Sequence, residues 1–371
     1  MKGNEKTFDT AGKRWEGIGP YYAMFPIRFV ESVIMEYSSV GESVIDPFAG
    51  RGSSVFNAAV LGRQGLGVEI NPVGWVYTKT KLRPAPLEQV EKRLLQIVAL
   101  SNDYAKHAET LPVFFQHCFS FKIRKFLLAA RAELDWRRKD CDRTLMTFLL
   151  IYLHGKKGQA LSNQMMQTKS MSPQYAVKWW SEKAITPPDL DIVHFMQKRI
   201  HWRYAKGTVD TSGSRVYLGD SIKILPQLVK NIGTAKDLRP KLLLTSPPYH
   251  GVTNYYYDQW LRLWLLGFES NAYKNRGPHK GRFTNIEQYQ KLLIKVFNHS
   301  SKIMSEDAVI YVRTSNSPVT KEATLIAMQN AFPKKKLVEK SQPYLKPTQT
   351  HLFGDKTSKV EEVDLIMLPS I

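Results

Sequence analysis

The sequence is poor in cysteine. Its 371 residues include two cysteines, Cys118 and Cys141, and neither has partners at metal-ligand spacing. So low a cysteine content is typical of a reducing compartment, in which both side chains stay as thiols. One disulfide between them is the alternative. The sequence therefore predicts no metal site.

Long apolar runs are absent as well. No segment reaches the ~18 consecutive apolar residues that cross a bilayer. The opening MKGNEKTFDTAGKRW lacks the apolar core that signal peptides carry. We expect a cytoplasmic protein with no membrane partner.

Acidic residues are scarce relative to basic ones. Lys and Arg number 53 against 33 Asp and Glu, which gives a formal charge of +20. A surplus of this size predicts attraction to a polyanion, most commonly nucleic acid. Adsorption to an acidic membrane surface and simple solubility are the alternatives. With 43% hydrophobic residues, the chain can also form a sizeable core.

Two parts of the chain have strands alternating with helices. Residues 43–45 predict a short strand, 53–61 a helix that ends at Gly62, and 65–70 the next strand. This βαβ pattern predicts an α/β fold with a mostly parallel sheet covered by helices. Short-strand patterns resume at VYLGD (216–220), LLLTSPPY (242–249), AVIYVRTS (308–315) and VDLIMLP (363–369).

The segment between these two parts has a different character. From residue 82 to residue 211 it carries long helical periodicity with many aromatic and basic residues. We therefore predict that 1–81 and 212–371 form one sheet domain, and that 82–211 is a mostly helical insertion.

A turn with two glycines follows the first predicted strand. Asp46-Pro47-Phe48-Ala49-Gly50-Arg51-Gly52-Ser53 stands where the strand passes into the helix. Gly50 and Gly52 let the backbone approach a ligand without a Cβ in the way, and free N–H groups at the helix start face the same space. Because the turn does not extend to G-x-G-x-x-G, a nicotinamide cofactor is not expected.

Polar residues end two further strands. Glu69 follows Asp46 near the ~20-residue offset at which an acidic residue meets ribose hydroxyls in nucleotide-binding βαβ units, and Asn71 comes directly after it. Capping of the next segment, or exposure to water, is the alternative for Glu69. Asp220 is placed to accept a hydrogen bond from an adenine amine. Capping of the following helix by Asp220 or Ser221 is the alternative, and the two roles are compatible.

The tetrapeptide Ser246-Pro247-Pro248-Tyr249 ends a buried strand. Two prolines fix their φ angles and project their carbonyls rigidly, and Tyr249 offers a flat face. We predict a site for a planar base with an amino group, in which Ser246 Oγ and the Pro247 carbonyl accept two N–H bonds while Tyr249 stacks on the ring. Acceptors around the amine would point its lone pair at a methyl donor. A plain turn is the alternative.

DPFAGRGS (46–53) followed by TSPPY (245–249) resembles the amino-methyltransferases of DNA, which make N4-methylcytosine and N6-methyladenine. The resemblance covers roughly residues 18–75 and 213–370, including Phe25 and Pro26 in a stretch, 21–26, that touches the cofactor in that family. The tail residues 347–350 and 352–355 are also similar to relatives with a Ser-Pro-Pro-Tyr site. The insertion departs from the family, because it falls between the second and third strands.

The resemblance implies a Rossmann-like methyltransferase sheet, mostly parallel with an antiparallel C-terminal strand, and S-adenosylmethionine as cofactor. It implies methylation of a base flipped out of double-stranded DNA. Ser246 favours cytosine N4, since family members that act on adenine usually have Asp or Asn there. The implied catalytic residues are Ser246, Pro247, Pro248 and Tyr249. The implied cofactor-binding residues are Phe25, Pro26, Asp46, Pro47, Phe48, Ala49, Gly50, Gly52, Ser53, Glu69, Asn71, Asp220 and Ser221.

The insertion supplies candidate DNA contacts and is the expected target-recognition region. Residues 154–159 predict a flexible basic loop, 162–169 carry amide and cationic groups that can read base edges, and 198–204 interleave basic and aromatic residues. A solvated surface is the alternative for each residue. Tyr255, Tyr256 and Tyr257 are candidates to line the base pocket, and 260–265 is expected to be core. The predicted DNA-binding residues are Lys156, Lys157, Gln164, Lys169, Arg199 and Arg203.

Three other functions are open. These are adenine N6 methylation by the same fold, methylation of an RNA amine, and DNA binding without catalysis. A restriction-modification or similar system is the expected context. A cognate restriction endonuclease is a candidate partner, and the chain is expected to be a monomer or a weak dimer.

Overall fold

The computed structural model describes residues 8–20, 25–232, 239–251, 254–270, 285–342 and 361–370. The chain folds into two compact units, which we name by their content. The helical unit comprises Met1–Tyr22, Lys79–Val209 and Tyr255–Lys280, and the sheet unit comprises Ala23–Thr78, Asp210–Asn254 and Gly281–Ile371. The division predicted from the sequence, at residues 81 and 211, differs from this one because it places 1–22 and 255–280 with the sheet. The separate functions predicted for its parts stay predictions.

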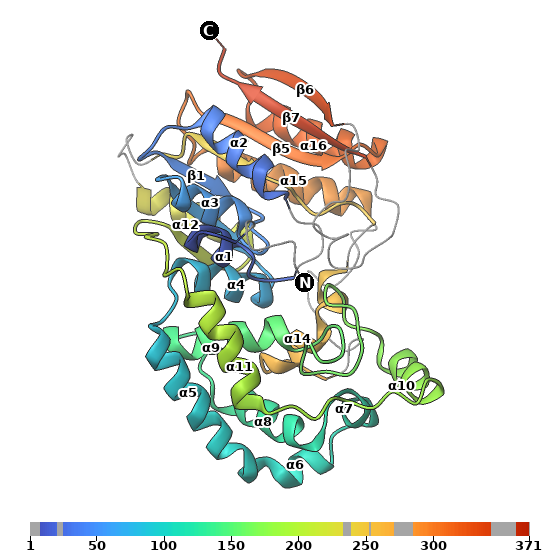
Figure 1. The fold of residues 1–371 in the computed structure, drawn as a ribbon. Helices are drawn as coiled ribbons and strands as arrows, with labels where there is room; N and C mark the ends of the chain where they lie inside the picture. Colours follow the sequence, from blue (N-terminus) through green and yellow to red (C-terminus); the bar gives the residue numbers. More distant parts are fainter. Residues whose placement is uncertain are drawn as a thin grey trace. The chain divides into compact units, whose positions relative to one another are not determined.

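The sheet unit is built on seven strands in the order β3-β2-β1-β4-β5-β7-β6 (Figure 1). The first five of these are parallel, and β7 is antiparallel to both of its neighbours. The mostly parallel α/β sheet with an antiparallel C-terminal strand is thereby confirmed. The strands are β1 (Ser43–Asp46), β2 (Gln64–Glu69), β3 (Arg215–Leu218), β4 (Leu242–Thr245), β5 (Val309–Ser315), β6 (Lys336–Gln342) and β7 (Glu362–Leu368).

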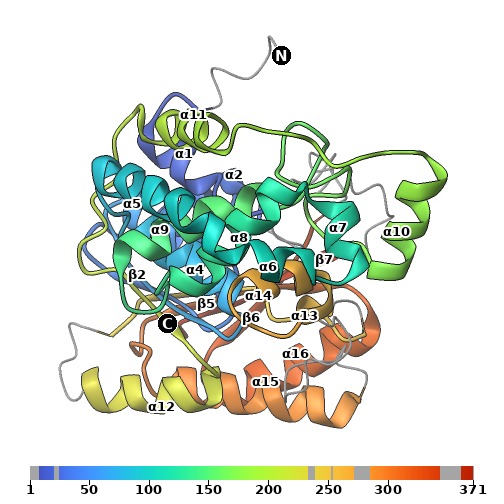
Figure 2. The same ribbon diagram turned by 90° about the horizontal axis from the view of Figure 1, so that it is seen from below.

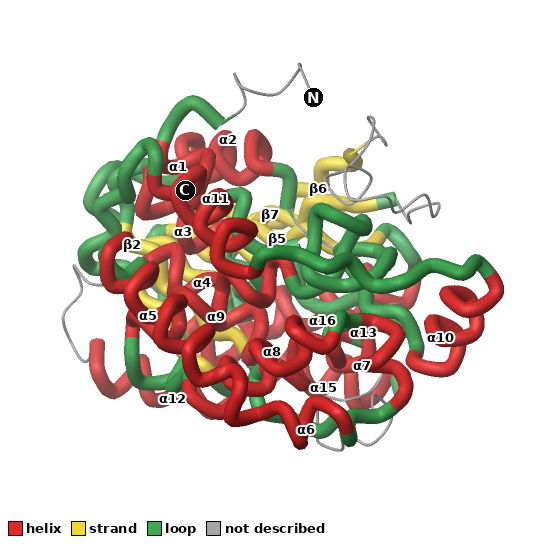
Figure 3. The backbone as a smooth tube through the Cα atoms, turned by 60° about the horizontal axis from the view of Figure 1, so that its bottom comes forward, coloured by secondary structure: helices red, strands yellow, loops and turns green. Residues whose placement is uncertain are grey.

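Helices cover both faces of this sheet, and the strands alternate between two cores. On one face, Val44, Leu242 and Leu244 pack with α2 (Ile27–Tyr37) and with Ala58. On the other, Ile45 and Leu243 pack with residues of α12, α15 and α16. These three helices are labelled in Figure 3, where helices are red. Burial on both faces explains why the strand sequences read as short continuous apolar runs. The remaining helices of the unit are α3 (Ser53–Val60), α12 (Ser221–Ile232), α15 (Ile286–Ser301) and α16 (Pro318–Ala331).

One strand, β6, was not predicted. Its sequence KLVEKSQ is rich in charge and has no apolar run. Strand β6 pairs with β7 on one side and lies at the end of the sheet order, where a strand is less buried than in the centre and does not need an apolar run. The exposed Lys336, Glu339 and Lys340 suit such an edge strand.

The helical unit confirms the helical character of the insertion. Its helix α9 (Asp140–Tyr152) lies in the interior over most of its length, since every residue from Asp142 to Ile151 is buried. Helix α5 packs against both α9 and α8 (Figure 2). The other helices are α1 (Ala11–Glu16), α5 (Leu87–Leu100), α6 (Ala105–Glu109), α7 (Val113–Cys118), α8 (Phe121–Glu133), α10 (Pro173–Glu182), α11 (Ile192–Tyr204), α13 (Tyr255–Asp258) and α14 (Trp260–Leu265), and α4 (Pro72–Leu82) runs from one unit into the other.

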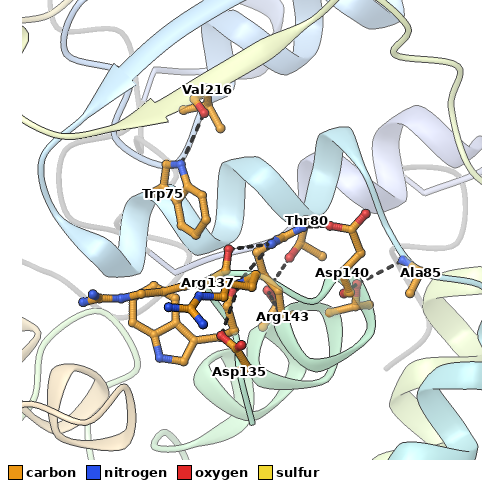
Figure 4. Close-up of polar contacts among 12 residues, drawn as sticks. Trp75, Thr80, Ala85, Asp135, Arg137, Asp140, Arg143 and Val216 are labelled. Carbon is orange, nitrogen blue, oxygen red and sulfur yellow. Dashed lines mark hydrogen bonds and ion pairs between the residues drawn. The ribbon is translucent and has the colours of Figure 1, made fainter. Parts of the chain in front are cut away.

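Basic side chains take part in the interior of the helical unit. Arg143, 1% exposed, forms an ion pair with Asp140 and donates to the Trp136 carbonyl at 3.4 Å (Figure 4). Burial lowers the pKa of Arg143 to about 10. Arg262 is fully buried and donates to the Leu150 carbonyl at 2.9 Å and the Gln167 carbonyl at 2.6 Å. Part of the large positive charge is therefore structural.

Helix α14 is core, as its spacing predicted, since all its residues are buried. No described helix is long and apolar enough to cross a membrane. Across the described residues there is no cluster of three or more His, Cys, Asp or Glu side chains able to hold a metal ion. Cys118 and Cys141 are both free thiols.

The packing of β2 on α3 depends on Gly65. A Cβ at this position would lie 2.1 Å from the Val55 carbonyl oxygen, a backbone atom that cannot rotate away. We expect Gly65→Ala to destabilise the sheet unit by about 2 kcal/mol or more, through overpacking. Thermal unfolding followed by circular dichroism measures the loss.

Gly158→Ala is the matched control for this change. Gly158 has φ +78° but open space around its Cβ position, so the substitution adds only backbone strain of about 1 kcal/mol. Equal effects of the two substitutions would show that the contact with Val55 does not limit the packing.

Candidate active site

The glycine turn lies at the carboxyl end of β1. Gly50 has φ +55° and Gly52 has φ +75°, left-handed conformations that favour glycine. The turn is held to the next strand, because Ala49 N–H donates to the Val68 carbonyl at 3.0 Å and Gly50 N–H donates to Glu69 Oε2 at 2.6 Å.

Gly52 serves a purpose that the sequence did not reveal. A Cβ there would lie 2.3 Å from Thr78 Cγ2, on α4. The missing Cβ of Gly52 therefore makes room for a helix of the same unit, and a contact between this turn and a ligand stays a prediction. Gly74 on α4 makes a similar contact, because its Cβ would lie 2.6 Å from the Gly50 carbonyl oxygen.

Glu69 is buried at the end of β2 and both of its oxygens accept backbone hydrogen bonds. Oε2 accepts from Gly50 N–H, and Oε1 accepts from Asn71 N–H at 2.7 Å. Burial raises the pKa of Glu69 to about 8, against the lowering effect of these two bonds. The capping alternative thus describes part of its role. Each oxygen retains a second lone pair, so a contact with ribose hydroxyls stays a prediction.

Asp46 connects the glycine turn to the Ser-Pro-Pro-Tyr loop. Its Oδ1 accepts from Phe48 N–H at 2.9 Å and from Thr245 Oγ1 at 2.6 Å, and its Oδ2 accepts from Ser54 Oγ. Burial raises the pKa of Asp46 to about 6, and all three hydrogen bonds oppose this rise. Strands β1 and β4 are neighbours in register, so the residues that follow them meet at one edge.

Among the buried polar atoms that have no hydrogen-bond partner in the described part of the chain, two lie near the turn and belong to uncharged side chains. They are Ser53 Oγ, at the first position of α3, and Asn71 Nδ2, just after β2. Asn71 Oδ1 is used, since it accepts from Val73 N–H at 3.0 Å. Buried polar atoms are rarely left unpaired in native proteins, so these two atoms suit a polar ligand at this edge.

Asp220 and Ser221 both have structural partners. Asp220 Oδ1 accepts from Ile222 N–H at 2.9 Å and caps α12, as its alternative interpretation predicted. Ser221 Oγ donates to the Pro47 carbonyl at 2.5 Å, which holds the end of β3 against the glycine turn. The contact of Asp220 with an adenine amine, and cofactor binding by Ser221, stay predictions.

The Ser-Pro-Pro-Tyr loop follows β4 directly. Ser246 and Tyr249 are half-buried and Pro247 is buried. Ser246 Oγ donates to Tyr249 Oη at 3.5 Å, and Tyr249 Oη donates to Glu362 Oε1 at 3.0 Å. Glu362 begins β7, opposite Ser315 at the end of β5, so it lies at the same edge of the sheet.

Several residues of this edge were missed from the sequence. Thr245 and Ser54 bind Asp46, and Glu362 binds Tyr249. Arg313 on β5 forms two hydrogen bonds to Asp364 on β7. The sequence holds a sign of this pair, because both are charged residues in otherwise apolar strands, and charged residues are rarely buried without a partner. Such a signal could have suggested that the two strands are neighbours.

Phe25 and Pro26 precede the sheet. Pro26 is the N-cap residue of α2, and the ring centroid of Phe25 lies 5.4 Å from that of Phe29. Their contact with a cofactor stays a prediction. The neighbouring residues 21–24, and the tail residues 347–350 and 352–355, lie outside the described residues.

The basic loop of the insertion is more ordered than expected at its base. His154 is fully buried between the Met166 carbonyl, at 2.7 Å from Nδ1, and Ser170 Oγ, at 3.2 Å from Nε2. Burial, with the nearby Arg262 cation, moves the pKa of His154 well below its usual value, so the ring is neutral. His154 therefore supports the loop and does not bind phosphate.

The predicted DNA contacts divide by exposure. Lys156 and Lys157 are exposed at the tip of the loop, and Lys169 is half-buried. Gln164 Oε1 accepts from Lys157 N–H at 2.9 Å and so shapes the loop. Arg199 is half-buried, with its guanidinium 3.3 Å from the centroid of the Phe195 ring.

Arg203 is a correction to the predicted set. Its side chain is buried, at 4% exposed, and it donates to the Arg14 carbonyl within the helical unit. Because its charge does not reach the surface of that unit, Arg203 is a structural residue and not a DNA contact. Ser162, Asn163 and Thr168 are fully buried as well, so they cannot read bases directly.

One protein family and one curated protein are similar to parts of this sequence. Residues 2–74 match the family described as DNA methylase (N6_N4_Mtase). The Type II methyltransferase M.MjaII of Methanocaldococcus jannaschii is 27% identical over 95 residues, which are 26% of this chain and 18% of that protein. The match thus spans less than a fifth of the curated relative.

One solved structure was aligned with most of the chain. It is the rRNA methyltransferase aviRa from Streptomyces viridochromogenes, with 12% identity, coverage of 95% of this chain and 88% of that chain, and a TM-score of 0.33. A score this low supports no conclusion about function. The two sequence matches, in contrast, agree with the motifs at the sheet edge, and over the parts that they cover the chain is similar to DNA methylases and to a Type II methyltransferase.

Proposed function

We propose that the chain transfers a methyl group from S-adenosylmethionine to the exocyclic amine of a base flipped out of double-stranded DNA, and that this base is cytosine, methylated at N4. The family match supports an amino-methyltransferase of the N4 or N6 type. Ser246, where adenine enzymes of the family usually carry Asp or Asn, favours cytosine. Adenine N6 is the second candidate.

One observation carries this proposal: the hydrogen bond from Thr245 Oγ1 to Asp46 Oδ1, 2.6 Å long. It joins the glycine turn after β1 to the Ser-Pro-Pro-Tyr loop after β4. From β1, the strands β2 and β3 are added on one side of the sheet and β4 and β5 on the other, so the order of strands reverses between β1 and β4. In open α/β sheets, ligands bind beyond the carboxyl ends of the strands at such a reversal.

The residues of the turn fit a nucleoside-containing cofactor. Ser53 Oγ and Asn71 Nδ2 are buried and need partners, and Glu69 has free lone pairs for ribose hydroxyls. When bound, S-adenosylmethionine would supply an activated methyl group. The role of the chain is then to hold that group and an amine in line, which lowers the entropic part of the barrier.

The residues of the loop fit the amine. An exocyclic amine is a weak nucleophile because its lone pair is delocalised into the ring. Acceptors at Ser246 Oγ and the Pro247 carbonyl would draw its hydrogens aside and leave the lone pair facing the donor, while Tyr249 stacks on the base. This is positioning and electrostatic catalysis, with no covalent intermediate.

Nucleoside mass spectrometry on DNA from cells that express the chain tests the proposal. We expect N4-methylcytosine, and its absence from cells that express Tyr249→Ala, which removes the stacking ring. Methyladenine in its place would make the choice of base wrong. No methylated nucleoside in DNA at any level of expression would refute the function.

The pKa of Glu69 predicts how cofactor binding depends on pH. The carboxyl group of the free protein is protonated below about pH 8, whereas ribose hydroxyls donate best to the ionised form. Binding should therefore release a proton, and affinity should rise about tenfold per pH unit toward pH 8 and level off above it. Calorimetric titration with S-adenosylmethionine from pH 6 to pH 9 measures this.

Glu69→Gln is the control for the titration. Its amide has a similar shape and does not titrate, so the affinity of this variant should be weaker and independent of pH. A slope that persists in Glu69→Gln would assign the proton to another group.

The exposed lysines at the loop tip predict a salt-dependent contact with DNA. Replacing both Lys156 and Lys157 by Ala should weaken binding to duplex DNA and reduce the slope of log K against log salt concentration by about 2. The double substitution of Lys291 and Lys295, exposed on α15, removes the same charge and should leave the slope unchanged. Equal losses from both pairs would mean that the loop has no special role. Fluorescence anisotropy at several salt concentrations measures the slopes.

The genetic context belongs to the proposal too. A restriction-modification or similar system, a nuclease partner and a monomeric or weakly dimeric state would suit an enzyme of this kind, and each awaits its own test.

A further inference from the structure

We propose that Glu362 is a positioning residue for the Ser-Pro-Pro-Tyr site, which sets the direction of the Tyr249 ring and of the hydroxyl hydrogens of Tyr249 and Ser246. The inference rests on the proposed function, because it concerns how the site receives an amine. Its basis is a continuous line of three polar groups from Ser246 to the start of β7.

The distances define this line. Tyr249 Oη lies 3.0 Å from Glu362 Oε1, and Ser246 Oγ lies 3.5 Å from Tyr249 Oη. A phenolic O–H lies in the plane of its ring. An acceptor fixed at one point therefore restricts both where the ring of Tyr249 points and how it turns. A stacking ring that follows two prolines gains its orientation from this tether.

The direction of the hydrogen bonds follows from the chemistry of the last group. An ionised carboxylate can only accept, so the hydroxyl of Tyr249 must donate to Glu362. The oxygen of Tyr249 is then left to accept from Ser246. Ser246 Oγ, having used its hydrogen, presents lone pairs to the substrate.

Glu362 is itself held in place by strands β5 and β7. Its Oε2 lies 4.0 Å from Arg313 Nε, on the neighbouring strand. Arg313 forms two bonds to the fully buried Asp364, at 2.6 and 2.8 Å, and its guanidinium lies 3.4 Å from the centroid of the Phe29 ring. Tyr311 donates to the same Asp364 at 2.8 Å. The tether of Tyr249 thus ends in a rigid part of the sheet.

The direction of the hydrogen bonds from Ser246 to Tyr249 and from Tyr249 to Glu362 allows the site to distinguish an amine from a carbonyl. A base that presents an amino group at Ser246 finds an acceptor there. A base with a carbonyl oxygen in the same place, as in thymine, meets lone pairs and loses a hydrogen bond. Two acceptors that face each other without a hydrogen lose binding free energy in a closed site. Glu362 would therefore favour the amino base through Tyr249 and Ser246, without touching the base itself.

A double-mutant cycle tests the inference. Glu362→Gln keeps the size of the side chain, but its amide can also donate, so the fixed direction is lost. We expect kcat to fall about tenfold, with the Kd for S-adenosylmethionine changed by less than about twofold. In the Tyr249→Phe background, where the ring stays and the hydroxyl is gone, the same substitution should change kcat by less than about twofold.

Glu361→Gln is the matched control. Glu361 is exposed, and its carboxylate lies 3.4 Å from Asn316 Nδ2, away from the line of hydroxyls. If Glu362→Gln behaves like Glu361→Gln, or lowers kcat equally in the wild-type and Tyr249→Phe backgrounds, the positioning role is wrong.

Failure of the proposed function gives a different result, namely a wild-type protein that methylates no DNA. Crystal structures of the wild type and Glu362→Ala then decide the inference without activity. We expect the Tyr249 ring to move or to show raised B-factors relative to its neighbours in the variant. An unchanged ring would overturn the role of Glu362.

Discussion

The site depends on one buried carboxylate. Asp46 accepts hydrogen bonds from its own turn, from α3 and from the residue before the Ser-Pro-Pro-Tyr loop. Burial raises its pKa to about 6, so at neutral pH the ionised group is held by three donors. Without it, two loops from adjacent strands would have no shared anchor, and the methyl donor and acceptor of the proposed reaction would lose their fixed placement.

Local patterns in the sequence were enough for the sheet and for the place of the site. Apolar runs that stop at Asp46, Glu69 and Thr245 mark the carboxyl ends of β1, β2 and β4, and the topology brings these ends together. The pairing of Tyr249 with Glu362 was beyond reach, since 113 residues separate them. Strand β6 was missed because an edge strand needs no apolar run.

Burial of polar residues limited the prediction of DNA contacts. His154, Asn163 and Arg203 look like surface residues by type, yet each satisfies backbone groups inside the helical unit. Sequence alone cannot separate a cation that holds a loop from one that faces solvent, because both occur among polar neighbours. Among the predicted contacts, Lys156 and Lys157 are exposed.

The charged edge strand β6 has a consequence for how copies of this protein meet at high concentration. A bare strand edge is a template for pairing with another chain. Along β6, Glu339 pairs with Lys321 on α16, and Lys340 reaches the Tyr37 hydroxyl on α2 at 3.3 Å. An incoming strand would have to displace these side chains and desolvate their charges, so this margin of the sheet resists aggregation during folding and storage.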